Sequence, residues 1–161
     1  MKIMKIDIIC VGKIKEKYFK DAISEYSKRL SRYVNLSITE VPDEKAPENL
    51  SESEQVMVKN KEGERILKAI KNSFVVVLDL KGKKLSSEGL ADFIQKTTVS
   101  GNGAMTFIIG GSLGLSDEVI KKADFRLCFS DMTFPHQLMR VILLEQIYRA
   151  ERILNNEPYH K

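Results

Sequence analysis

The residues with the clearest capacity for chemistry fall into three short stretches, each following an apolar run typical of a buried strand. These stretches are residues 78–84, the glycine-rich residues 110–115, and residues 130–136. Glycine leaves backbone amides and carbonyls uncovered, so a planar or sugar-like ligand can lie close to them. His136 follows the third stretch at a helix start, where it can act as a general base or contact a substrate. A lone histidine at such a position is also often only structural.

The glycine-rich stretch formally matches G-x-S-x-G, the nucleophile elbow of serine hydrolases, with Ser112 as the nucleophile. Acids and histidines follow in the required order: Asp124 or Asp131, then His136 or His160. Against this, the elbow helix should begin directly after the serine, whereas Ser116 is the predicted helix cap. The stretch matches neither the dinucleotide fingerprint nor the P-loop. A turn without a ligand, a hydrolase elbow and a bare ligand-binding loop therefore remain as alternatives.

The end of the chain combines an aromatic side chain, a histidine and a cation in Tyr159, His160 and Lys161. Chain ends usually fray, but here Tyr159 can stack on a base while Lys161 meets a phosphate. Three lysines near the start are further candidate phosphate contacts, although lysines on a helix are usually only solvated: Lys13, Lys15 and Lys17.

Strand-like and helix-like runs alternate along the whole chain with no break in composition. We expect strands at 3–11, 36–41, 74–80, 104–109 and 125–129. We expect helices at 15–30 and 117–122. Two more should begin after Ser51, which forms a capping box with Glu54, and after Ser86 or Ser87. A last helix should carry Pro135 in its first turn. The pattern predicts one α/β domain over residues 1–161 with a largely parallel sheet. Because ligands bind at the carboxyl ends of parallel strands, the three chemical stretches should meet there.

The last helix carries two apolar stripes instead of one. One stripe consists of Leu138, Val141, Ile142 and Tyr148; the other consists of Met139, Leu143, Ile147, Ala150 and Leu154. A helix with a single buried face needs only one stripe. The second stripe predicts contact with a partner, most simply a second copy of the chain.

The composition indicates an ordinary globular protein, with 43% hydrophobic and 30% charged residues. A net charge of +4 permits contact with a polyanion but does not require it. Cys10 and Cys128 lie in strand-like runs without metal-ligand spacing, so we expect buried, reduced thiols and no metal. We see no signal peptide and no apolar run of membrane-spanning length, and we expect a cytoplasmic protein.

Several long blocks resemble the RlmH family, which belongs to the SPOUT class of methyltransferases and modifies N3 of a pseudouridine in 23S rRNA. The blocks are VGKIKEKYF, EVPDEKAPE, LDLKGKKLSSEGLA, FIIGGSLGL, FSDMTFPHQLMRVILLEQIYRA and the final PYHK. The resemblance runs from end to end. It implies an S-adenosylmethionine-dependent enzyme, a homodimer, a C-terminal trefoil knot, no metal, and the assembled ribosome as substrate.

The resemblance also assigns residues. It places the S-adenosylmethionine pocket on Leu78, Gly110, Phe129, Ser130, Asp131, Met132, Thr133 and Phe134. It places the substrate side on His136, Arg140, Tyr159, His160 and Lys161. His136 is the first candidate to take the N3 proton and His160 the second, while proton loss through water stays open. Many relatives end in His-Arg or continue further, so Lys161 would meet phosphate without arginine's bidentate fork.

Two alternatives compete with a methyltransferase: an esterase acting through Ser112, and a ribosome-binding module without a cofactor. For the methyltransferase, the positive charge of the sulfonium disappears during transfer, so a strongly anionic pocket would stabilise the ground state. Asp131 is therefore expected to turn its carboxylate away from the sulfur.

Overall fold

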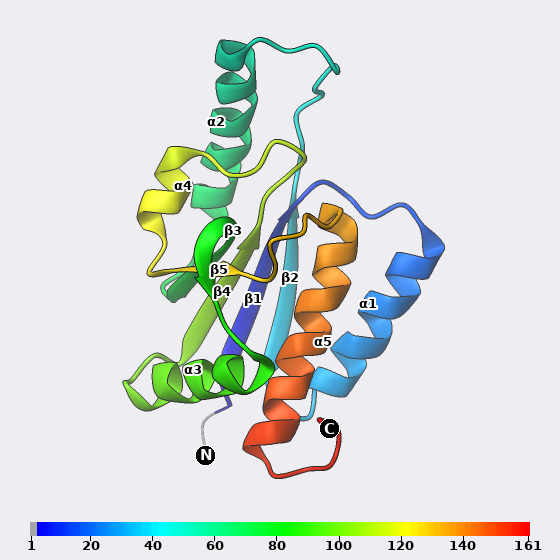
Figure 1. Ribbon diagram of the computed structural model, residues 1–161, viewed down its shortest axis with the longest axis vertical. Helices are drawn as coiled ribbons and strands as arrows, with labels where there is room; N and C mark the ends of the chain where they lie inside the picture. The colour runs from blue at the N-terminus through cyan, green and yellow to red at the C-terminus, as the bar shows by residue number, and fades with distance from the viewer. Residues whose placement is uncertain (1–2) are drawn as a thin grey trace.

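Strands and helices alternate along the chain in the computed structural model, which describes residues 3–161 (Figure 1). The strands are β1 (Lys5–Val11), β2 (Asn35–Val41), β3 (Phe74–Lys84), β4 (Ala104–Ile109) and β5 (Phe125–Cys128). The helices are α1 (Lys17–Leu30), α2 (Glu52–Ala69), α3 (Ser87–Val99), α4 (Asp117–Lys122) and α5 (His136–Leu154). The strands form one sheet in the order β2-β1-β4-β3-β5, and all neighbouring pairs are parallel. This confirms the predicted α/β class and parallel sheet.

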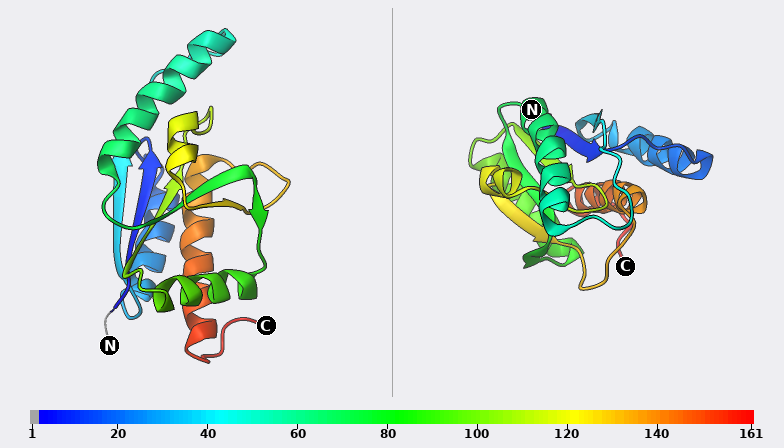
Figure 2. Two further views of the ribbon diagram at one scale, coloured as in Figure 1. Left: turned by 90° about the vertical axis from the view of Figure 1, so that its left-hand side faces the viewer. Right: turned by 90° about the horizontal axis from the view of Figure 1, so that it is seen from above.

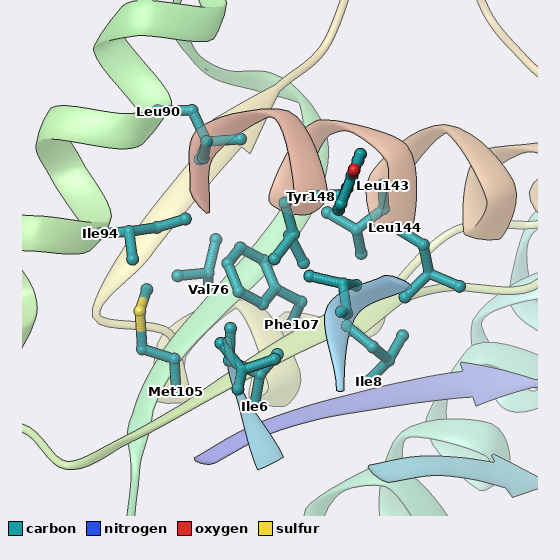
Figure 3. Close-up of a cluster of buried hydrophobic side chains, with 14 of the residues drawn as sticks. Ile6, Ile8, Val76, Leu90, Ile94, Met105, Phe107, Leu143, Leu144 and Tyr148 are labelled. Atoms are coloured by element: carbon teal, nitrogen blue, oxygen red, sulfur yellow. The ribbon is translucent and has the colours of Figure 1, made fainter. Parts of the chain in front are cut away.

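Helices cover both faces of the sheet, which explains why its strands are apolar on both sides (Figure 2). Alternate residues of β1 enter different clusters: Ile8 packs on the side of α1, α3 and α5, while Ile9 packs with Ile66 of α2 and Val119 of α4. Figure 3 shows the larger cluster, whose labelled members are Ile6, Ile8, Val76, Leu90, Ile94, Met105, Phe107, Leu143, Leu144 and Tyr148. This two-sided burial fixes the strand ends from which the site is built.

The two stripes of α5 meet different environments. Met139, Leu143, Ile147 and Ala150 are buried in the core, as one predicted stripe requires, and Leu154 packs partly buried beside them. Tyr148, on the other predicted stripe, is buried against Tyr159 at a ring-centroid distance of 4.9 Å. The end of the chain folds back over that ring and covers it. Leu138, Val141 and Ile142 remain outside or half-buried.

β3 is longer than predicted, because residues 81–84 continue the strand beyond the expected end at Leu80. Its pairing with β5 shifts register, so that both Leu78 and Lys83 are aligned with Leu127. The residues between them, 79–82, bulge out and are called the β3 arch below. The arch is tied to β5 by an ion pair between Asp79 and Arg126. A cross-strand pair of this kind depends on register, which the local sequence pattern does not contain.

Serine caps set the helix starts as predicted. Ser51 and Glu54 form the capping box of α2, Ser86 caps α3, and Ser116 caps α4. Pro135 was expected inside the first turn of α5, but it stands outside as the N-cap residue with extended ψ, and α1 begins at Lys17 instead of Lys15. Cys10 and Cys128 are both buried and unpaired, as predicted. Within residues 3–161, no helix combines the length and apolarity needed to cross a membrane.

Candidate functional site

A hollow of about 660 Å³ opens at the carboxyl end of the sheet. Its lining comes from the three stretches singled out in the sequence, together with the first turn of α5: Leu78–Leu80, Ile109–Leu115, Leu127, Phe129, Ser130, Met132–His136 and Met139. The predicted convergence of the three stretches is therefore confirmed. A volume of this size is typical of pockets that enclose a nucleoside-sized ligand.

The glycine loop, residues 110–115, forms one wall of the hollow and is folded tightly on itself. The Gly114 N–H donates to the Gly111 carbonyl at 3.1 Å, and Gly114 has φ of +87°, a conformation that favours glycine. A Cβ on Gly110 would lie 2.9 Å from the carbonyl carbon of Gly114. The sequence interpretation was that glycine leaves room for a ligand; the structure shows that Gly110 must first leave room for the loop's own backbone.

The β3 arch forms a second wall. Its Gly82 lies so close to β5 that a Cβ would be 2.6 Å from the carbonyl carbon of Arg126. Asp79 accepts a hydrogen bond from the Lys81 N–H at 3.1 Å and pairs with Arg126, so its charge is neutralised beside the hollow. Leu80 stands at the opening with 61% of its surface exposed. The arch thus presents a neutralised acid and an apolar side chain to any ligand.

The third wall is the turn between β5 and α5. Phe129, Ser130, Met132, Thr133 and Phe134 all line the hollow. The Met132 N–H donates to Ser130 Oγ at 3.0 Å, which holds the turn in shape, and the Met132 side chain is 73% exposed. Apolar side chains at an opening can close on the faces of a flat ring.

Asp131 is the exception among the residues assigned to the cofactor. It does not belong to the lining of the hollow. Its carboxylate lies 2.5 Å from Lys84 Nζ in an exposed ion pair. The expectation that this carboxylate turns away from a bound sulfonium agrees with this position, and its contact with the cofactor stays a prediction.

His136 lines the hollow at the first residue of α5 and is half-buried. Burial lowers the pKa of its imidazole, and the positive charge of Arg140 lowers it further, while Asp43 acts in the opposite direction. The ring is therefore held in the neutral form near pH 7. A neutral imidazole beside a ligand-sized hollow can accept a proton.

Arg140 is placed by the structure away from the hollow. Its guanidinium is only 2% exposed, and it donates to Glu40 Oε2 at 2.7 Å and to the carbonyls of Val11 and Gly12 at 3.1 and 2.7 Å. A contact between Arg140 and the substrate stays a prediction. Arg140 fixes the start of α5 to the ends of β1 and β2 and supplies the charge that acts on His136.

The final residues lie at the opposite end of α5 from the hollow (Figure 1). With 19 residues in α5 at about 1.5 Å per residue, the two ends of the helix are roughly 28 Å apart. Tyr159 donates to Glu145 Oε1 at 3.2 Å, and His160 lies between Arg149 and Glu88. The structure therefore does not bring Tyr159, His160 or the exposed Lys161 to the hollow of their own chain.

The tautomer of His160 follows from its neighbours. Arg149 can only donate, so His160 Nδ1 accepts from it at 3.1 Å. In a neutral ring, Nε2 then carries the hydrogen and donates to Glu88 Oε1 at 2.6 Å. Both ring nitrogens are engaged, which leaves His160 less suited than His136 to take a proton.

The hydrolase interpretation of Ser112 lacks its required geometry. Ser112 lies in the wall of the hollow, but α4 begins only at Asp117, after its cap at Ser116. A nucleophile elbow needs a helix directly after the serine. Within residues 3–161, no hydrogen bond joins Ser112 to His136 or His160. The G-x-S-x-G match is therefore a formal one.

The sequence did not identify several lining residues. Asp79 and Leu80 lay at the end of a predicted strand without an assigned role, while Leu127 and Met139 were taken only as strand and apolar helix residues. No local signal separates an apolar residue that forms the base of a hollow from one that fills the core. The pairing of Asp79 with Arg126 depends on the alignment of β3 and β5, which only the folded chain provides.

Comparison with known proteins identifies methyltransferases as the relatives of this chain. Residues 4–160 match the family described as "Predicted SPOUT methyltransferase". The chain is 66% identical over 159 residues to "Ribosomal RNA large subunit methyltransferase H" of Alkaliphilus oremlandii and 62% identical to "Ribosomal RNA large subunit methyltransferase H 1" of Clostridium perfringens, covering 98% of this chain and 100% of each relative.

Solved structures share the fold at much lower identity. The SpoU methyltransferase AviRb from Streptomyces viridochromogenes, in complex with the cofactor AdoMet, superimposes with a TM-score of 0.50 at 15% identity. The superposition covers 98% of this chain and 60% of that one.

Proposed function

The chain belongs to the SPOUT methyltransferase family, and from this membership we propose that it is an S-adenosylmethionine-dependent methyltransferase of 23S rRNA. The proposed reaction is methylation of N3 of a pseudouridine in the large ribosomal subunit, with the assembled ribosome as substrate. The end-to-end relatives at 66% and 62% identity are named for methylation of large-subunit ribosomal RNA, which supports the substrate class. The particular base and its position come from the resemblance to the RlmH family.

The observation that carries this proposal is the hollow itself. All of the residues that the resemblance assigns to the cofactor, except Asp131, line it: Leu78, Gly110, Phe129, Ser130, Met132, Thr133 and Phe134. The hollow fits a cationic nucleoside, because its walls are mainly backbone and apolar or uncharged polar side chains and its one lining acid, Asp79, is neutralised by Arg126. The backbone of the glycine loop and the third wall would hold the adenosine, and Leu80 and Met132 would cover it.

When bound, S-adenosylmethionine supplies a sulfonium methyl group that is already a strong electrophile. The chain's own task is then mainly to align the ring nitrogen with that group and to exclude water. The nitrogen N3 carries a hydrogen that must leave before or during attack. His136, neutral and half-buried at the edge of the hollow, is positioned to accept that proton. Proton loss through water is the alternative that the variant in the Discussion tests.

We propose that the active form is a homodimer in which the chain end of one copy completes the site of the other. Tyr159, His160 and Lys161 are separated by the length of α5 from the hollow of their own chain, so a role beside the substrate requires a second copy. The outward stripe of α5 borders a groove of about 340 Å³, which is lined by Ile142 and Gln146 of α5 among others. An apolar stripe beside a groove is a suitable surface for a second copy.

Ile142→Glu tests this interface. We expect the wild-type chain to sediment at twice its 18.3 kDa mass and Ile142→Glu to sediment as a monomer, because a buried charge without a partner opposes association. Val56→Glu is the matched control, since Val56 is 48% exposed on α2, across the sheet from α5. A wild-type chain that stays monomeric at high concentration would remove the proposed dimer.

Two further features come from the family resemblance. We propose a trefoil knot in the C-terminal segment. We also propose that Lys13, Lys15, Lys17 and the chain end contact rRNA phosphates. Residues 3–161 form one α/β domain, and no separate RNA-binding module is appended to it within those residues. Much of the specificity would then come from the combined surface of two subunits.

The esterase alternative is tested by covalent labelling. We expect no adduct on Ser112 after incubation with a fluorophosphonate, as measured by intact mass, because no histidine is hydrogen-bonded to the serine. A known serine hydrolase treated in parallel serves as the positive control. An adduct that disappears in Ser112→Ala would favour the hydrolase.

Methyl transfer itself is the test of the proposed function. Ribosomes that lack this modification are incubated with the protein and S-adenosylmethionine carrying a labelled methyl group, and the 23S rRNA is digested to nucleosides. We expect label on N3 of one pseudouridine. Label on another atom would contradict the proposed reaction, and ribosome binding without cofactor binding would favour the non-enzymatic module.

A further inference from the structure

Glu62, on α2, is a buried acid that the proposed chemistry does not use. Only 5% of the residue is exposed. Its Oε2 accepts a hydrogen bond from the Glu44 N–H at 3.0 Å, whereas its Oε1 is buried without a partner among residues 3–161. Leaving a buried carboxyl oxygen without a hydrogen bond costs free energy, so this position calls for an explanation.

The carboxyl of Glu62 lies against the glycine loop from behind. A Cβ built on Gly111 would be 3.0 Å from Glu62 Oε1 and 3.4 Å from Oε2. The next residue of the same helix, Gly63, packs on the other end of the loop, where its own Cβ would be 2.3 Å from Ser116 Oγ. One turn of α2 therefore touches the loop both where it leaves β4 and where it enters α4.

On its other side, Glu62 holds the segment that follows β2. Glu62 accepts the hydrogen bond from the Glu44 N–H, and Arg65 donates to the Pro42 carbonyl at 2.9 Å and pairs with the Glu44 carboxylate. Asp43, between these residues, is one of the charges that act on His136. Glu62 thus joins a wall of the hollow to the segment that faces His136.

Burial is the main reason why the neutral form of Glu62 is favoured. Burial raises the pKa of Glu62, the Glu44 N–H lowers it, and the charges of Asp43 and Glu44 raise it against the opposing effect of Arg65. Ionisation would place a negative charge on an oxygen that has no donor, directly beside the backbone of Gly111. A raised pKa means that the neutral form prevails at low pH and is lost as pH rises through that pKa.

We propose that Glu62 is the positioning residue of the glycine loop, and that its contacts with Gly111 and Glu44 set the affinity of the hollow for S-adenosylmethionine. This inference rests on the proposed function for the identity of the ligand. Glu62 does not line the hollow, so it acts on the ligand only through the loop.

Calorimetry with S-adenosylmethionine on the full-length chain tests the proposal. We expect Glu62→Ala to weaken binding at least tenfold, because the loop loses its support, while Glu62→Gln recovers most of that loss. We expect affinity in the wild type to fall as pH rises from 5 to 8 and this pH dependence to flatten in Glu62→Gln. Glu64→Ala, which alters an exposed acid on the same helix, is the matched control and should bind as the wild type does.

A pair of variants tests the contact itself. Gly111→Ala places a methyl group against the Glu62 carboxyl and should weaken binding. In the double variant with Glu62→Ala, the two losses should add to less than their sum, because each change alters the same contact. Hydrogen exchange of the amides at residues 110–115 provides a readout without any ligand, and it should accelerate in Glu62→Ala. Equal exchange and equal affinity in Glu62→Ala and the wild type would overturn the proposal.

If Glu62→Ala does not fold, the outcome rests on Glu62→Gln, and a pH profile parallel to that of the wild type would overturn the proposal. Failure of the wild type to bind S-adenosylmethionine would instead contradict the proposed function. In that case the exchange experiment would still decide whether Glu62 supports the loop.

Discussion

Gly110→Val is expected to weaken the binding of S-adenosylmethionine severely while the sheet stays folded. The first atom of any side chain at this position would lie 2.9 Å from the Gly114 carbonyl carbon and 3.1 Å from its oxygen. Valine adds two more carbons to that collision, so the loop must move. Overpacking typically costs about 1–3 kcal/mol, and about 1.4 kcal/mol corresponds to a tenfold change in affinity. We therefore expect a loss on the order of 100-fold, measured by calorimetry.

The control for this variant is Gly103→Val. Gly103 precedes β4 and lies at the other end of the strand from the hollow, and a Cβ added to it would meet nothing within 4 Å. This variant should bind the cofactor as the wild type does. Circular dichroism and the unfolding temperature would show that both variants are folded. Normal binding by a folded Gly110→Val would mean that the cofactor does not depend on the glycine loop.

His136→Ala is expected to lower kcat for methyl transfer by about 10²–10⁴-fold, the usual range for loss of a general base. The wild-type rate should fall as pH drops, because protonation removes the acceptor form of the ring. Burial and Arg140 lower the pKa of His136, so this fall should begin below the ordinary histidine range. In the variant this pH dependence should disappear.

Single-turnover rates on ribosomes, measured from pH 5 to 8, separate this role from a structural one. His136 also lines the hollow, so cofactor affinity must be measured in parallel to distinguish an effect on binding from an effect on the transfer step. His160→Ala is the comparison, because both nitrogens of that ring are already hydrogen-bonded. A rate within threefold of the wild type and an unchanged pH profile in His136→Ala would show that water takes the proton.

The sequence was sufficient for features that depend on local chemistry. Ser51 with Glu54, Ser86 and Ser116 marked helix starts, because a serine side chain satisfies the free N–H groups there. The apolar runs marked strands, because a sheet covered on both faces buries both sides of its central strands. The meeting of the three stretches at one end of the sheet followed from its parallel topology. This prediction needs no knowledge of side-chain contacts, because the carboxyl ends of parallel strands share one edge.

The sequence was insufficient where a residue's role depends on a distant partner. Arg140 was assigned to the substrate, but its guanidinium is bound to Glu40, one hundred positions away in the chain. Helical spacing also did not reveal that Tyr159 returns over the ring of Tyr148. Residues 81–84 were not expected in the strand, because their lysines and glycine obscured a strand whose register shifts. Glu62 was not singled out, because the sequence does not distinguish a buried acid on a helix from a solvent-exposed one.

The central claim is that the hollow between the β3 arch, the glycine loop and the turn before α5 binds the methyl donor. A crystal structure with S-adenosylmethionine or its demethylated product tests it most directly. We predict that the ligand lies against Leu78, Gly110 and Met132, with its sulfur on the side of His136. A ligand found elsewhere on the chain, with this hollow empty, would contradict the claim.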